Sequence, residues 1–242
     1  MARSSDDGTE SVNSPPIGEV NERQPAKMFD LTMFMTENGL VQIAQLRKAT
    51  EGDHAAVEGS FSLLSDKLSV REYLNTLERM YGFIHTWELL VENLAPSDLL
   101  PLVQARARRD LLRVDIAALQ GNPPLPVTAP MPAVTSRSKL LGALYVMEGS
   151  RLGGQLLARH VESVLDLRDG LGTAYFRGFG DRTGSMWKEL LQVLETEIPD
   201  TEAELAIATA RQMFQAFGGW MRSDDPISAT ELTRQVEEFR RG

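Results

Sequence analysis

The chain has 242 residues, of which 42% are hydrophobic and 24% are charged, and its formal net charge is −9. This hydrophobic share is enough to bury the core of a soluble domain. The acidic balance argues against nucleic-acid binding, which relies on a basic surface. The sequence has no cysteine and three histidines, so disulfides, thiolate catalysis, Cys-ligated zinc and iron–sulfur clusters are excluded.

The difference in composition between residues 1–24 and the rest of the chain predicts the domain organisation. Residues 1–24 are rich in Ser, Asp, Glu, Pro and Asn, which predicts a disordered acidic and polar tail. A single helical domain is expected over residues 25–242. The longest uncharged apolar stretch near the middle, Leu140–Met147, is far shorter than the roughly 20 residues that cross a bilayer, so no membrane span is expected. No apolar core follows a basic start, so no secretory signal is expected and the cytoplasm is the predicted compartment.

Helical periodicity continues through most of the chain. An apolar face that repeats every third or fourth residue from Ile43 to Phe61 indicates the first helix. The sequence Ser69–Glu72 is a capping box, which predicts the start of the second. Further helices are predicted over about residues 100–120, 136–165, 187–197, 201–220 and 228–239, with Thr201 in the cap of the fourth of these.

The intervening segments are predicted to be irregular. Five prolines between residues 121 and 132 indicate an extended connection, and five glycines between Asp169 and Gly184 indicate a loop. The basic segment Arg106–Arg113 is interpreted as a solvated helix face. No segment alternates apolar and polar residues convincingly, so the predicted fold class is all-α, a single-domain bundle of seven or eight helices.

His54 is the first candidate for chemistry. It lies on the apolar face of its helix, between Thr50 and Val57. The structural interpretation is a core histidine whose hydrogen bonds are satisfied. The functional interpretation is a metal ligand directed into the bundle, since one proximal histidine often holds haem iron. His85 and His160 carry no comparable signal.

The second candidate is a glycine pattern in the predicted central helix. Gly149, Gly153 and Gly154 fall within six residues, and each interior glycine costs about 1 kcal/mol relative to alanine. Gly149 and Gly153 share a face with Tyr145, one turn earlier. That face lets a flat ligand approach the backbone and permits a kink, or else it serves close packing of two helices.

Other metal chemistry has weaker support. A di-iron bundle needs a Glu-x-x-His motif on each of two helices, and this chain has the motif once, at Glu51–His54. The sequence has no P-loop, no Rossmann fingerprint and no Gly-x-Ser-x-Gly motif.

Four groups of motifs occur in an order known from one family. They are Leu46–His54; Phe61–Leu64 with Tyr81–Phe83; Tyr145–Gly154; and Tyr175–Gly180 with Thr183, Gly184 and Trp187. Over residues 40–220 the chain resembles bacterial haem oxygenases, most closely the subgroup associated with bacteriophytochromes. The resemblance identifies the His54 segment with the proximal helix and the Gly149–Gly153 segment with the distal helix.

The resemblance implies a haem oxygenase, for which haem is both cofactor and substrate. Electrons from a ferredoxin or reductase, together with O2, would convert haem to biliverdin, carbon monoxide and ferrous iron. A bacteriophytochrome would be the partner that receives the biliverdin. His54 would bind the iron, and the backbone at Gly149 and Gly153 would crowd the distal side, where Ser150 would help to anchor water and Tyr145 would contact the haem.

The resemblance also implies roles for several charged residues. Glu58, one turn after His54, would orient the imidazole. Arg47 would pair with a haem propionate, and Arg177 and Lys188 are further candidates for that pairing. Ser150 departs from family members that have an aspartate after the first distal glycine. Two alternatives to catalysis stay open: a non-catalytic haem carrier or sensor, and a helical protein of this architecture without haem.

Overall fold

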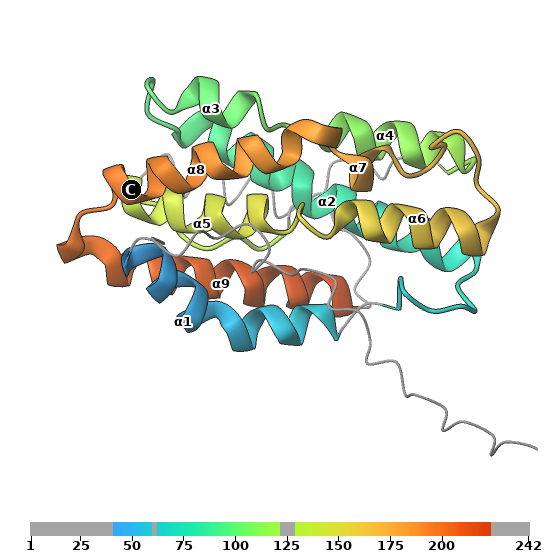
Figure 1. Ribbon diagram of the computed structural model, residues 1–242, viewed down its shortest axis with the longest axis horizontal. Coiled ribbons are helices and arrows are strands. Elements are labelled where there is room, and N and C mark those ends of the chain that lie inside the picture. Colours follow the sequence, from blue (N-terminus) through green and yellow to red (C-terminus); the bar gives the residue numbers. More distant parts are fainter. Residues whose placement is uncertain (1–40, 60–61, 122–128, 224–242) are drawn as a thin grey trace, which may run out of the picture.

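The computed structural model describes residues 41–59, 62–121 and 129–223. The predicted tail and the predicted helix at residues 228–239 lie outside these ranges. Every regular element in the described residues is helical, which confirms the all-α class (Figure 1). The elements are α1 (Val41–Glu58), α2 (Val70–Leu94), α3 (Leu100–Gln104), α4 (Arg109–Ala118), α5 (Arg137–Gly149), α6 (Gly154–Leu165), α7 (Ala174–Arg177), η2 (Gly180–Arg182), α8 (Thr183–Glu197), η3 (Asp200–Glu202) and α9 (Ala203–Arg222).

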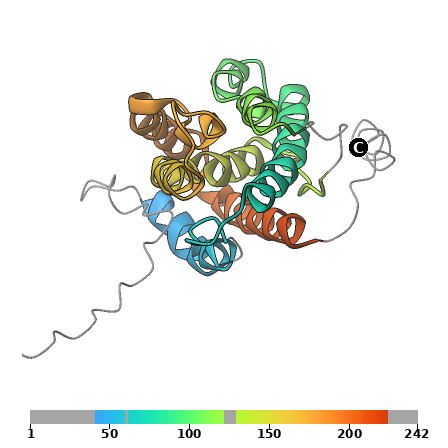
Figure 2. The same cartoon turned by 90° about the vertical axis from the view of Figure 1, so that its right-hand side faces the viewer.

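Helix α5 lies in the middle of the bundle. It packs against α9 on one side and α8 on the other, while α1 lies along α9 (Figures 1 and 2). All its residues from Leu140 to Gly149 are buried, as expected for a helix that is apolar on every side. A Cβ atom at Gly142 would lie 2.2 Å from the carbonyl oxygen of Ala206, so this glycine allows the close crossing of α5 and α9.

The predicted helix over residues 136–165 is two helices, and this is the correction that matters most for the site. A turn at residues 150–153 separates α5 from α6. Its backbone hydrogen bonds are of the 3₁₀ type. The N–H of Arg151 donates to the carbonyl oxygen of Glu148, and the N–H of Leu152 donates to that of Gly149, each three residues earlier. A Cβ at Gly154 would lie 2.3 Å from the carbonyl oxygen of Phe176, so α6 begins directly against α7.

The predicted helix over residues 100–120 is also interrupted. Residues 105–108 separate α3 from α4, and Arg106 and Arg108 are each only 5% exposed. The prediction of a solvated basic face was therefore wrong for Arg106 and Arg108, whereas Arg113 is exposed as predicted. Glu88 of α2 explains the break, because its carboxylate accepts hydrogen bonds from the backbone N–H groups of Arg108 and Arg109 at 2.5 and 3.0 Å.

Two further boundaries differ from the predictions. The segment expected to be an irregular loop contains α7, η2 and the start of α8. Helix α9 begins at Ala203 with Glu202 as its N-cap residue, and Thr201 belongs to η3 instead. The capping box at Ser69 and Glu72 is present as predicted.

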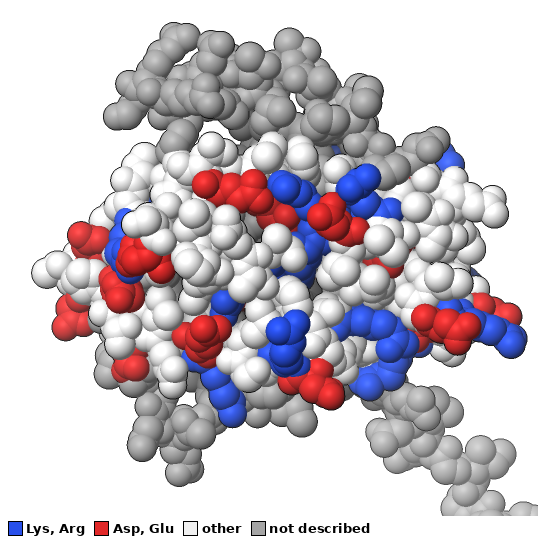
Figure 3. Space-filling view, turned by 90° about the horizontal axis from the view of Figure 1, so that it is seen from above, with Lys and Arg blue, Asp and Glu red and all other residues white. Residues whose placement is uncertain are grey.

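The face of the molecule drawn in Figure 3 carries charges of both signs. The face seen from above in Figure 3 carries basic and acidic side chains side by side, with no continuous basic area on its described residues. None of the described helices is long and apolar enough to span a bilayer.

Candidate functional site

A cavity lies between α1, α2, the α5–α6 turn, α7 and α9. It encloses about 730 Å³ of space free of protein atoms, part of it open to solvent. Most of its wall is apolar. The polar or titratable side chains in the wall are His54, Arg108, Ser150, Arg151 and Tyr175.

His54 enters the cavity from α1. Its ring meets Phe214 of α9 edge to face, with the centroids 5.6 Å apart, and its Nδ1 is 3.8 Å from Glu58 Oε2. The side chain is 17% exposed. Burial lowers the pKa of His54, while the Glu58 carboxylate opposes this shift. The neutral imidazole, which is the form that binds iron, is therefore favoured at neutral pH.

The α5–α6 turn forms a second part of the wall. Ser150 and Arg151 line the cavity, and so does Gly154 at the start of α6. The Ser150 hydroxyl donates to the carbonyl oxygen of Met147 at 2.9 Å. Gly149 and Gly153 are buried at the two ends of the turn, but they are not among the cavity-lining residues.

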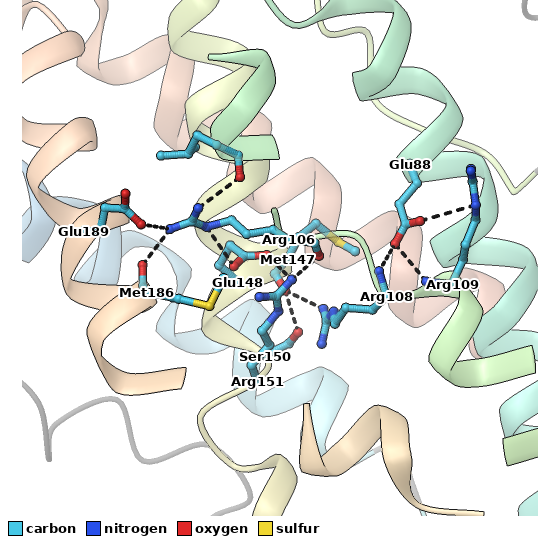
Figure 4. Close-up of polar contacts among 11 residues, drawn as sticks. Glu88, Arg106, Arg108, Arg109, Met147, Glu148, Ser150, Arg151, Met186 and Glu189 are labelled. Carbon is cyan, nitrogen blue, oxygen red and sulfur yellow. Dashed lines mark hydrogen bonds and ion pairs between the residues drawn. The ribbon is translucent and has the colours of Figure 1, made fainter. Parts of the chain in front are cut away.

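A buried ionic network, which we call the Glu148 network, lies behind this turn (Figure 4). Glu148 Oε1 is 2.7 Å from Arg151 Nη2, and Glu148 Oε2 is 3.2 Å from Arg106 Nε. Arg106 also reaches Glu189 of α8 at 2.8 Å and the carbonyl oxygen of Met186 at 2.8 Å. Burial raises the pKa of Glu148, and the surrounding arginines oppose this shift. The network ties α5 and α8 to the segment between α3 and α4.

Arg108 connects that segment to the cavity. It donates to the carbonyl oxygen of Met147 at 2.8 Å, and its guanidinium carbon lies 4.6 Å from the centre of the Tyr175 ring. Sequence reasoning missed the arginines at 106, 108 and 151. One signal was present, because Glu148 and Arg151 are three residues apart, on either side of Gly149.

The other predicted site residues lie elsewhere. Tyr145 is buried, and its ring centre lies 5.6 Å from that of Trp187. Burial raises the pKa of Tyr145 to about 12, while the hydrogen bond with Thr50 and the charge of Arg47 oppose this shift. Arg47 is half-buried on α1 and Lys188 is exposed on α8. The described residues that line the cavity do not include Tyr145, Arg47, Lys188 or Arg177.

Arg177 has a carboxylate partner within the protein. Its Nε and Nη2 donate to the two oxygens of Glu162 at 2.8 and 2.6 Å. Thr173 also donates to Glu162, with a short contact between their oxygens. This cluster holds α7 on α6.

Asp115 of α4 holds the other side of α7. Its carboxylate accepts from the backbone N–H groups of Ala174 and Tyr175 at 2.7 and 2.8 Å. Tyr73 fixes the preceding loop by donating to the carbonyl oxygen of Gly172 at 2.6 Å. Burial raises the pKa of Asp115 to about 6, although the two N–H donors favour the charged form.

The Asp115 pKa predicts a pH-dependent effect of Asp115→Asn. Between the ordinary pKa near 3.8 and about 6, the folded chain binds a proton that the unfolded chain has lost, so this group's contribution to stability falls as pH rises. We expect the wild type's stability relative to Asp115→Asn to drop by roughly 3 kcal/mol between pH 3.5 and 7. Urea unfolding at a series of pH values measures this difference.

The matched control is Asp110→Asn, which changes an exposed aspartate of the same helix. Its stability relative to the wild type should vary by less than about 0.5 kcal/mol over the same range. Equal slopes for the two variants would contradict the assignment to Asp115.

The cavity's donor set fits one imidazole-bound metal better than a carboxylate cluster. No group of three or more His, Cys, Asp or Glu side chains suited to a metal ion occurs in residues 41–59, 62–121 and 129–223. The wall instead offers a single imidazole, apolar contacts and cationic donors. Such a set can hold one metal ion through the imidazole and can favour an anionic ligand through the arginines.

A family model described as "Heme oxygenase" matches residues 42–223. The chain belongs to the haem oxygenase family. The protein is 28% identical over 175 residues to heme oxygenase PigA of Pseudomonas aeruginosa, a match that covers 72% of this chain and 88% of the relative. It is 36% identical over 117 residues to a heme oxygenase of Xanthomonas campestris, covering 47% of this chain and 67% of that one.

Solved haem oxygenases have the same fold. The heme oxygenase of Neisseria meningitidis superimposes with a TM-score of 0.63 at 21% identity, covering 78% of this chain and 97% of that one. The enzyme of Leptospira interrogans gives 0.60 at 22% identity, covering 74% and 98%. The predicted family, fold and enzyme class are thereby confirmed, and haem is the substrate and prosthetic group of that family.

Proposed function

We propose that this haem oxygenase binds haem in the cavity between α1 and the α5–α6 turn, with His54 as the iron ligand. The observation that carries the proposal is the pairing within one cavity of a half-buried, neutral imidazole with polar side chains of a glycine-flanked turn. The apolar side chains from α2 and α9 would contact the faces and edges of the ring. When bound, haem supplies the iron that activates O2 and the meso carbon that is oxidised, yielding biliverdin, carbon monoxide and ferrous iron.

Different residues of the chain would have different roles around the bound haem. Glu58 would orient His54 through Nδ1, which leaves Nε2 for the iron. The buried turn at Gly149–Gly153 would limit the space on the other side and exclude bulk water. The roles predicted for Gly149, Ser150 and Gly153 on the distal side rest on this arrangement and on the family resemblance.

The propionate contacts stay predictions. Arg47 and Lys188 have the charge for this role. Arg177 has it too, but a propionate would compete with the bond pair to Glu162. Tyr145 is predicted to contact haem. Through its hydrogen bond with Thr50 of α1 and its ring contact with Trp187 of α8, it would instead help to hold these helices in place.

We further propose a ferredoxin or reductase as the electron donor and a bacteriophytochrome as the recipient of biliverdin. The electron donor follows from the resemblance of residues 40–220 to haem oxygenases, and the bacteriophytochrome follows from the resemblance of the same residues to the subgroup associated with it. The cytoplasm stays the predicted compartment.

Turnover distinguishes an oxygenase from a haem carrier or sensor. We expect the hemin-loaded protein, given reductant and O2, to lose its Soret band and release a bilin identifiable by mass. A protein that keeps its haem under these conditions, with the Soret band intact, would be a carrier. Failure to bind hemin stoichiometrically would overturn the proposal altogether.

A further inference from the structure

The imidazole of His54 packs against an aromatic ring from another helix. The Phe214 ring of α9 meets it edge to face, with the ring centroids 5.6 Å apart and the ring planes at 83°. Both side chains line the cavity, and Phe214 is only 7% exposed. The outer torsion of a histidine side chain has broad preferences, so neighbouring atoms decide how the ring is turned. Phe214 is therefore placed to set the plane of the imidazole.

Glu58 has a different effect on the same imidazole. Its Oε2 lies 3.8 Å from His54 Nδ1, a distance at which opposite charges attract but which is longer than a hydrogen bond. The carboxylate favours a proton on Nδ1, which leaves Nε2 for a metal. Because the contact is long, it selects the nitrogen without fixing the plane of the ring.

The residue before His54 ties α1 to α9, and we call this contact the Asp53 clamp (Asp53, Arg211 and Gln215). One oxygen of the Asp53 carboxylate accepts from Arg211 Nε at 2.8 Å, and the other accepts from Gln215 Nε2 at 3.1 Å. The two donors are one turn apart on α9, and Phe214 directly precedes Gln215. A slide of α1 along α9 would therefore break at least one of these hydrogen bonds.

A close apolar contact lies on the other side of the two rings. Helices α1 and α9 run in the same direction (Figure 1). One turn further along both helices, Gly218 is buried against Val57, whose Cγ2 would lie 3.3 Å from an added Cβ. The contact between His54 and Phe214 is thus held between the Asp53 clamp and this apolar contact.

The Asp53 clamp is better suited to setting register than to adding stability. The side chain of Arg211 is 52% exposed and that of Asp53 is 15% exposed. Water and salt screen an ion pair with an exposed arginine, so such a pair adds little to the free energy of unfolding. Its hydrogen bonds nevertheless join α1 next to His54 with α9 next to Phe214.

We propose that Phe214 fixes the plane of the His54 imidazole and that the Asp53 clamp keeps the two rings in register. Phe214 and Asp53 are thus positioning residues for the iron ligand. This inference rests on the proposed function, because it takes His54 as that ligand. The contacts are present without haem, so the imidazole needs no reorientation when the iron binds.

The g-values of the low-spin ferric protein test the role of Phe214 without measuring turnover. These values depend on the direction of the axial imidazole plane, and electron paramagnetic resonance of the hemin-loaded protein with added azide measures them. We expect one set of g-values in the wild type. Phe214→Leu should give broadened g-values or a second set, because leucine has no flat ring to hold the imidazole.

Phe176→Leu is the matched control for that variant. It makes the same change in the wall of the same cavity, where Phe176 stacks on Tyr73. Its g-values should be those of the wild type. Unchanged g-values in Phe214→Leu, or an equal change in Phe176→Leu, would overturn the proposal.

The Asp53 clamp has a test of its own in the hemin-free protein, where nuclear Overhauser effects between the ring protons of His54 and Phe214 report their contact. Asp53→Ala should weaken these effects and lower hemin affinity by no more than about fivefold, because the pair is exposed. Asp53→Asn should retain them, since asparagine keeps a hydrogen bond with each partner once the Gln215 amide turns over.

Glu51→Ala is the control for the clamp, because it removes an exposed carboxylate from the same helix. It should leave the ring contact as in the wild type. An unchanged contact in Asp53→Ala, or an equal loss in Glu51→Ala, would contradict the role of the clamp. A loss in Asp53→Asn as large as that in Asp53→Ala would show that charge acts in place of register.

His54→Ala separates this inference from the proposed function. If the g-values of the azide complex are the same in His54→Ala and the wild type, His54 is not the ligand, and both proposals fail. If they change in His54→Ala but stay as in the wild type in Phe214→Leu and Asp53→Ala, this inference alone fails.

Discussion

Replacing Glu148 with glutamine is expected to lower the free energy of unfolding by about 3–5 kcal/mol, the cost of breaking a buried ion pair from one side. The carboxylate is 5% exposed and lies within 3.2 Å of both Arg106 and Arg151. Glutamine keeps the shape but leaves the two guanidinium groups buried with less opposing charge. Urea unfolding with linear extrapolation measures the loss.

The other carboxylate on Arg106 gives a matched control. Glu189 bonds the same guanidinium at 2.8 Å, but its side chain is 60% exposed. Glu189→Gln should therefore cost less than about 1 kcal/mol, because water screens and replaces an exposed pair. Similar losses for the two variants would contradict the claim that burial makes Glu148 the centre of the network.

Replacing His54 with alanine is expected to weaken hemin binding by about 100-fold, or roughly 2.8 kcal/mol at 1.4 kcal/mol for each factor of ten. His54 is the one histidine among the described residues that line the cavity, so this substitution removes the predicted iron ligand. The apolar contacts from α2 and α9 remain and should retain weak binding. Hemin titration, followed by the Soret band and by quenching of tryptophan fluorescence, gives both affinities.

Two comparisons make the His54→Ala result specific. His160→Ala removes a histidine that lies on α6 outside the cavity wall, where its Nε2 is 3.4 Å from the Ser65 carbonyl oxygen. Its hemin affinity should stay within about threefold of the wild type. Metal-free protoporphyrin should bind the wild type and His54→Ala equally well, since it has no iron to coordinate. Equal hemin affinities in the two histidine variants would exclude His54 as the ligand.

The parts of the fold that local sequence determines were predictable. The apolar repeat from Ile43 gave α1, and the capping box at Ser69 gave the start of α2, because both depend on neighbours within one or two turns. The position of His54 on the inner face of α1 followed from the same repeat. The glycine pattern indicated a weak point in the central helix, which the structure shows as the α5–α6 turn.

The parts that depend on distant partners were not predictable from one sequence. Arg106 and Arg108 read as solvated charges because their partners, Glu148, Glu189 and the Met147 carbonyl, lie about 40 to 80 residues away. The break between α3 and α4 depends in the same way on Glu88 of α2. Burying these charges required knowledge of the packing, which hydrophobic periodicity does not contain.

A crystal structure of the hemin complex tests the central claim most directly. The proposal predicts a porphyrin within the cavity between α1 and the α5–α6 turn, with its iron bonded to His54 Nε2 and its other face toward Ser150 and Arg151. A porphyrin bound elsewhere, or iron bonded to a residue other than His54, would contradict it.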